Sequence, residues 1–186
     1  MKKFLITTII IAFSTVNFAN AQKKKPDNKI IDPQIINREN KTIEKAKTWI
    51  TLAVAGSLNK ANGLAENTND EAEGKHQEIY TAKYMAYKDD AMNVDMDGGM
   101  SLKAFTKKWT KDFSCKYAGI GVGYLVPGQD YGLIKVTRCD FTKKIGNAYL
   151  FGVTIRDTEA KIDYKRDIKV IPSGNVFLIE DVLEYN

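Results

Sequence analysis

Strict two-residue alternation over residues 159–171 constrains the fold of this chain more than any other feature. Its odd positions from Glu159 to Lys169 carry charges of alternating sign, and its even positions are mostly apolar. Side chains of a strand point alternately to the two faces of a sheet, so the pattern predicts an antiparallel strand with one solvated and one buried face. A single residue, Arg166, breaks the buried phase.

Three further stretches predict strands around this one, over residues 132–141, 147–157 and 176–185. Pro172, Ser173, Gly174 and Asn175 supply turn chemistry before the last of them. A shorter alternating run, residues 113–117, precedes glycines that indicate a bend or bulge.

Apolar residues before position 113 recur at three- and four-residue spacing, which is typical of amphipathic helices. The spacing predicts helices over residues 42–62 and 70–94 and a shorter one that Ser101 caps. Helices followed by strands indicate an α+β domain over residues 41–186, with N-terminal helices packed on one face of a curved antiparallel sheet of four to six strands. Residues 22–40 are polar and are interpreted as a leader or linker.

This element order, with the long C-terminal strands and the closing run at residues 176–182, resembles the nuclear-transport-factor-2-like, or cystatin-like, α+β roll. It is also similar to small secreted bacterial proteins with this architecture. The resemblance implies an N-terminal helix pair packed in the concavity of a strongly bent antiparallel sheet. The superfamily includes isomerases, dehydratases and many non-catalytic binders, so the fold does not determine a function.

The first 21 residues have the order of a secretory signal. Lys2 and Lys3 precede an apolar run at residues 4–13, and the small-residue pattern at residues 19–21 predicts cleavage after Ala21. The run is about half of the ~20 residues that span a bilayer, and no later run is longer. The mature chain is therefore expected in the periplasm or outside the cell, without a membrane span.

Charge argues against nucleic acid as a partner. The chain has 28 basic and 23 acidic residues, and loss of Lys2 and Lys3 with the signal leaves a net charge of +3. Much of that charge lies in the lysine triplet at residues 23–25, whereas a nucleic-acid binder has a stronger basic bias. No phosphate-binding glycine motif is present, and we expect no cofactor.

Two cysteines, Cys115 and Cys139, remain after cleavage. Export makes a disulfide between them chemically possible, and each lies in an alternating apolar pattern, so we favour a Cys115–Cys139 bond. The alternative is two buried free thiols, because cysteine is commonly buried on packing grounds alone. Neither a Cys-x-x-Cys spacing nor a nearby histidine is present, which argues against zinc binding or redox catalysis.

The buried phase of the charged strand supplies the first candidate site. A lone buried arginine pairs with a carboxylate, reaches solvent at a strand end, or faces a cavity in which it binds an anion. Tyrosines on the second helix and the strand could line such a cavity. Arg138, in phase with apolar neighbours, is a weaker second candidate. The candidate ligand-binding residues are Arg166, Tyr80, Tyr84, Tyr87 and Tyr164.

Other sequence motifs give weaker indications of a functional site. Residues 93–98 match half of a calcium loop, but Ala104 occupies the position of the essential final glutamate. His76 is the only histidine and lies among charged residues. Asp140 and Glu180 are the only acidic residues in an apolar strand phase that stand out. We therefore assign no catalytic residue and no metal ligand.

The favoured function is binding of an unidentified small ligand or protein through the concave face, without catalysis. A lyase or isomerase acting in the cavity is one alternative, which a buried carboxylate beside a tyrosine would favour. A periplasmic inhibitor or immunity-like interaction protein is another, which an exposed aromatic patch would favour.

Overall fold

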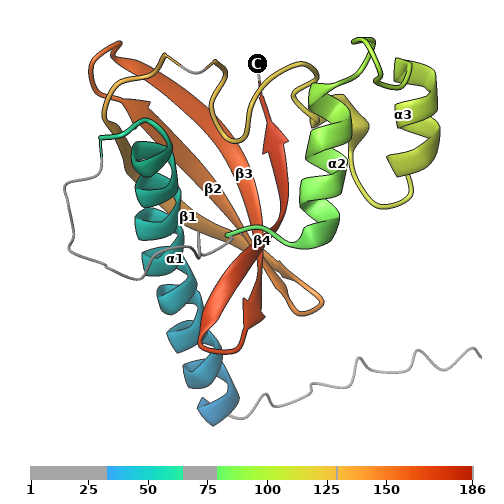
Figure 1. Cartoon of the computed structure of the whole chain (residues 1–186). Helices are drawn as coiled ribbons and strands as arrows, with labels where there is room; N and C mark the ends of the chain where they lie inside the picture. Colours follow the sequence, from blue (N-terminus) through green and yellow to red (C-terminus); the bar gives the residue numbers. More distant parts are fainter. Residues whose placement is uncertain (1–32, 65–78, 129, 186) are drawn as a thin grey trace, which may run out of the picture. The chain divides into compact units, whose positions relative to one another are not determined.

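The computed structural model describes residues 33–64, 79–128 and 130–185 (Figure 1). The predicted signal sequence, its cleavage site and His76 lie outside these residues. In chain order the elements are α1 (Pro33–Ala61), α2 (Ala82–Met92), α3 (Leu102–Trp109), the short 3₁₀ helix η1 (Cys115–Tyr117), β1 (Ile134–Ile145), β2 (Ala148–Asp157), β3 (Ile162–Ser173) and β4 (Val176–Glu184). The α+β class is thereby confirmed.

The four strands form one antiparallel sheet in the order β1-β2-β3-β4, so each strand pairs with its sequence neighbour. The tight turns at Gly146 and Gly174 use backbone φ angles of 62° and 59°, which glycine adopts without steric cost. All four strands agree closely with the stretches that alternation predicts. In the central register, Arg166 lies opposite Val153 on one side and Glu184 on the other.

Helices pack against this sheet. The main contacts of α1 are with β1, and those of α2 are with β4 (Figure 1). The apolar stripe of α1 is buried at Ala46, Ile50, Val54 and Leu58, as the spacing predicts. These side chains join the inward-facing residues of the strands in one apolar core. None of the helices that the structure describes is long and apolar enough to cross a bilayer.

Two helix starts differ from the sequence interpretation. Residues 33–40, interpreted as the end of a leader, belong to α1; proline is favoured in a first helical turn, and the exposed Ile35 and Ile36 give no core-facing stripe there. In α2 the first residue is Ala82, because Thr81 caps the helix by accepting from the Tyr84 amide at 3.2 Å. Tyr80, predicted to be helical, is extended and bridges to Ile179 of β4.

The alternating run at residues 113–117 is not a strand, and the predicted disulfide is not formed. Cys115 lies in η1 and Cys139 on β1, and both are free thiols. The ring of Phe113 stacks on that of Tyr87, with centroids 4.1 Å apart, so its apolar character serves helix packing and not a sheet. Because residues 113–117 form no strand, Cys115 does not become a sheet neighbour of Cys139.

Candidate functional site

Three charged side chains lie in the interior, where α2 meets the last two strands. Lys88 of α2 is 0% exposed, and Arg166 of β3 and Glu184 of β4 are each 3% exposed. The last two are direct cross-strand neighbours on the buried face of the sheet. We call these three residues the charge cluster.

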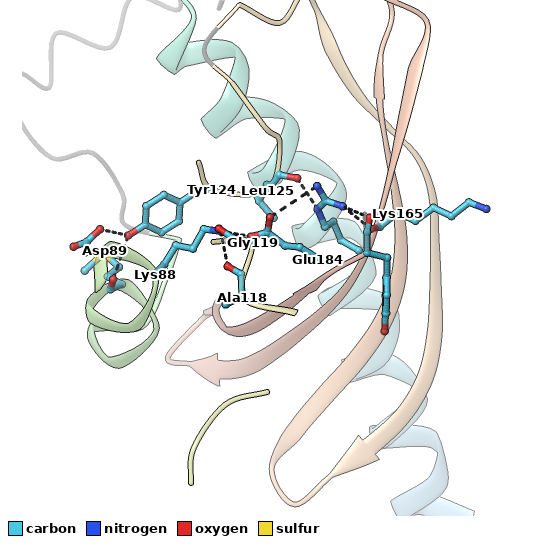
Figure 2. Close-up of polar contacts among 11 residues, drawn as sticks. Lys88, Asp89, Ala118, Gly119, Tyr124, Leu125, Lys165 and Glu184 are labelled. Carbon is cyan, nitrogen blue, oxygen red and sulfur yellow. Dashed lines mark hydrogen bonds and ion pairs between the residues drawn. The ribbon is translucent and has the colours of Figure 1, made fainter. Parts of the chain in front are cut away.

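Lys88 binds both the carboxylate of the cluster and a stretch of backbone beside it. Its Nζ contacts Glu184 Oε1 and donates to the carbonyls of Ala118, at 2.9 Å, and Gly119, at 3.3 Å. Figure 2 shows the side chain reaching from α2 toward these partners. All three donor sites of the ammonium group are thereby used, which offsets the cost of its burial.

Arg166 uses its guanidinium in a similar way. Its Nε donates to the Leu125 carbonyl at 2.8 Å, and its Nη1 to the carbonyls of Lys165, at 2.8 Å, and Tyr185, at 3.2 Å. Its Nη2 lies 3.9 Å from Glu184 Oε2. This is the internal pairing that the sequence left open, and backbone carbonyls and Glu184 are the partners of the guanidinium.

Burial and mutual attraction act against each other in the cluster. Burial lowers the pKa of Lys88 and of Arg166 and raises the pKa of Glu184, because each charged form loses its hydration. The attraction between the carboxylate and the two cations opposes all three shifts. Within the described residues Glu184 Oε2 accepts no hydrogen bond. The carboxylate of Glu184 is thus the one negative charge in the cluster, and it pairs with two cations.

The backbone that the cluster binds belongs to residues 118–128, which we call the covering segment. Gly119 has a φ of 60°, and a Cβ built there would lie 2.3 Å from Glu184 Oε2 and 2.7 Å from Lys88 Nζ. The segment can lie this close to the charge cluster because glycine has no Cβ at position 119. Lys88 and Arg166 together hold it through the carbonyls of Ala118, Gly119 and Leu125.

A groove of about 530 Å³ lies between the C-terminal end of α1 and the covering segment. Three tyrosines line it, and we call it the tyrosine groove. Its full lining is Ser57, Leu58, Ala61, Asn62, Tyr80, Gly123, Tyr124, Val126, Gly128, Asp130 and Tyr131. A volume of this size falls within the roughly 300–1,000 Å³ of small-molecule sites.

Hydrogen bonds fix two of the three rings. The Tyr131 hydroxyl donates to the Leu58 carbonyl at 3.2 Å, and the Asn62 side chain donates to the Tyr131 carbonyl. The Tyr124 hydroxyl donates to Asp89 Oδ1 at 2.7 Å, a contact drawn in Figure 2. The walls of the groove are thus tied to α1 on one side and to α2 on the other.

Tyr80 contributes the third ring, with its centroid 4.8 Å from that of Tyr124. Burial raises its pKa, and the neighbouring Tyr124 and the carboxylate of Glu184 raise it further. The phenol therefore stays protonated at any physiological pH. No hydrogen-bond partner of its hydroxyl is present within residues 33–64, 79–128 and 130–185.

The five residues proposed from sequence do not form one site. Tyr80 lines the tyrosine groove, whereas Tyr84 and Tyr87 are 1% exposed and pack in the aromatic core. Tyr164 is half-buried, with the guanidinium carbon of Arg166 5.8 Å from its ring centroid. The weaker candidate, Arg138, is exposed and pairs with Asp140.

Sequence reasoning missed Lys88, Glu184, Tyr124 and Tyr131. Lys88 lies four residues after Tyr84 on the buried side of α2, and this spacing was a usable signal. Glu184, Tyr124 and Tyr131 gave no such signal in the sequence. The inward position of Glu184 depends on a strand irregularity, and Tyr124 and Tyr131 lie in a segment without periodicity.

The half calcium loop at residues 93–98 connects α2 to α3. Its Asp95 has a φ of 59°, and Asp95 Oδ1 accepts from the Leu102 amide at 3.4 Å. Among the residues that the structure describes, no three His, Cys, Asp or Glu side chains are grouped closely enough to hold a metal ion.

Asp181 gives the fold a pH dependence outside the groove. It pairs with Lys169 across β3 and β4, with 3.8 Å between Nζ and Oδ2, and its Oδ1 is buried without a partner among the described residues. Burial raises its pKa from 3.8 to about 6. Between these two values the folded state binds a proton that the unfolded state has lost, so this residue makes stability fall as pH rises from 4 to 6.

Asp181→Asn should therefore raise the free energy of unfolding at pH 7.5, by about 1–3 kcal/mol, and have little effect at pH 4. Urea denaturation at both pH values measures the difference. Glu180→Gln, which removes the exposed second carboxylate beside Lys169, is the matched control. An equal effect of Asp181→Asn at pH 4 and pH 7.5 would contradict the assignment.

Comparisons of the chain with protein-family models, with curated proteins and with solved structures found no match.

Proposed function

We propose that this chain is an exported, non-catalytic domain that binds a small ligand in the tyrosine groove. The observation that carries the proposal is a groove of about 530 Å³ lined by Tyr80, Tyr124 and Tyr131. Tyrosine rings offer large apolar contact area with a polar tip, at a low cost in side-chain entropy. Hydrogen bonds to α1 and α2 hold two of the rings in place before a ligand arrives.

The covering segment forms one wall of the groove, and this wall is ordered before a ligand binds. It supplies four lining residues, Gly123, Tyr124, Val126 and Gly128, and the charge cluster binds the same segment a few residues away. Arg166, proposed from sequence as a ligand contact, then acts as a positioning residue for the groove wall. A wall fixed in advance costs less to order when a ligand binds.

Export and the detailed fold remain proposals that rest on sequence. The signal order of residues 1–21 supports delivery to the periplasm or the medium. For the roll with a strongly bent sheet, the support is element order together with three register shifts, at Val136/Arg138, Phe141/Lys143 and Lys169/Val170. Register shifts of this kind bend strands.

The charge cluster supports binding more than catalysis. A buried carboxylate near tyrosines is what a lyase or isomerase would use as a base. Glu184 is instead bonded to Lys88, and Gly119 lies directly against it, so no room for a substrate remains beside the carboxylate.

A fragment screen by ¹⁵N-¹H correlation spectroscopy tests the proposal. We expect weak binders whose largest shift changes fall on the amides of Tyr80, Tyr124 and Tyr131. Tyr131→Leu should weaken their binding about tenfold, the typical effect of removing a central aromatic contact. Tyr117→Leu, which removes a half-buried tyrosine that packs on Tyr185 outside the groove, should leave binding unchanged. Shift changes that avoid the three tyrosines would contradict the proposal.

A further inference from the structure

We infer that the tyrosine groove selects organic cations with an apolar surface, such as quaternary ammonium compounds. The inference rests on the proposed function, because it names the ligand class of the same groove. Three independent features support it: the charge of the lining, the helix end that forms one wall, and the chemistry of the three rings.

The first feature is the charge of the lining. Asp130 is the one ionisable carboxylate among the residues that line the groove, and this described lining contains no lysine or arginine. Asp130 is exposed, and its side chain forms no ion pair within the part of the chain that the structure describes. An anionic ligand would meet repulsion here, whereas a cation would gain a counter-ion.

The second feature is the orientation of α1. This helix has 29 residues and ends at Ala61, and Ser57, Leu58 and Ala61 of its C-terminal end line the groove. Aligned peptide dipoles place partial negative charge at a helix C-terminus, within the last turn. The backbone wall of the groove therefore attracts positive charge independently of Asp130.

The third feature is the set of rings. The face of an aromatic ring carries negative electrostatic potential and attracts an ammonium group within about 6 Å of its centroid. Burial keeps the phenol of Tyr80 protonated, and hydrogen bonds orient Tyr124 and Tyr131. Quaternary ammonium groups suit such a site because they have no N–H donors that would need partners.

Nearby cations do not reverse this preference. Lys88 and Arg166 are buried, and both face Glu184 and backbone carbonyls. Lys60, in the last turn of α1, is exposed and is not part of the groove lining.

Choline and 3,3-dimethyl-1-butanol, its uncharged analogue of nearly the same shape, test the inference. Both are titrated into the purified protein at low salt, and the amide shifts of Tyr80, Tyr124 and Tyr131 are followed. We expect choline to bind at least about tenfold more tightly, because the analogue lacks the attraction to ring faces and carboxylate. Added sodium chloride should weaken choline binding and leave the analogue unaffected.

Asp130→Asn provides the residue-level test. It should weaken choline binding several-fold without changing binding of the analogue, whereas Asp163→Asn, on β3 and not part of the groove lining, should change neither. Equal affinities for the two compounds, or absence of choline binding while screened fragments still shift the groove amides, would overturn the cation inference and leave the binding proposal intact. If no fragment shifts these amides either, the proposed function fails as well.

Discussion

Glu184→Gln should lower the free energy of unfolding by about 3–5 kcal/mol, the range expected when one partner of a buried ion pair is removed. The substitution nearly preserves the shape of the side chain, so lost charge dominates the effect. It leaves Lys88 and Arg166 buried together without a counter-charge. Urea denaturation at pH 7, monitored by circular dichroism, measures the loss.

Two controls separate this effect from ordinary loss of a salt bridge. Lys88→Met should cost less than Glu184→Gln, because the carboxylate keeps Arg166 as a partner and methionine fills similar space. Asp140→Asn, which breaks the exposed pair with Arg138, should cost under about 1 kcal/mol. Equal losses in the three variants would show that the charge cluster has no special role in stability.

Gly119→Ala should be nearly as damaging, with an expected loss of about 3 kcal/mol from backbone strain and steric overlap combined. The φ of 60° is unfavourable for alanine, and the new methyl group would lie 2.3 Å from Glu184 Oε2. Either the carboxylate or the covering segment must move, and each movement separates Lys88 from its acceptors.

Gly121→Ala is the matched control, since Gly121 lies two residues away with a φ of 70° and no atom within 4 Å of a built Cβ. It should show backbone strain alone, about 1–2 kcal/mol. The same denaturation measurement applies to both variants. If the two alanine substitutions cost the same, close contact between Gly119 and the charge cluster does not contribute.

Periodicity predicted most of the sheet, because a half-buried strand records its two faces directly in sequence. It failed where tertiary contacts set the backbone. Tyr80 continues a helical spacing toward Tyr84 and Tyr87, yet it pairs with Ile179 in an extended conformation. At residues 113–117 the alternation has another cause, because Phe113 packs on Tyr87 and no strand forms there.

The site was harder to predict than the fold, and Glu184 shows why. In β4 the buried positions are Phe177 and Ile179 and then Val182 and Glu184, so the phase shifts by one residue. The register shift opposite Lys169/Val170 causes this change, and it turns Glu184 inward beside Arg166. A one-residue irregularity leaves no mark in composition, so Arg166 appeared to have no partner.

The charge cluster holds the covering segment, and hydrogen exchange of two amides tests this role most directly. The Gly121 amide donates to the Ala91 carbonyl at 3.1 Å, and the Val122 amide to the Gly119 carbonyl at 3.1 Å. Their exchange is compared between Glu184→Gln and Ile50→Ala, a core variant of similar expected stability loss on α1, whose main contacts are with β1. We predict exchange at least about tenfold faster in Glu184→Gln, because opening of the segment then hydrates Lys88 and Arg166, which are left buried without a counter-charge. Equal exchange rates in the two variants would contradict the claim.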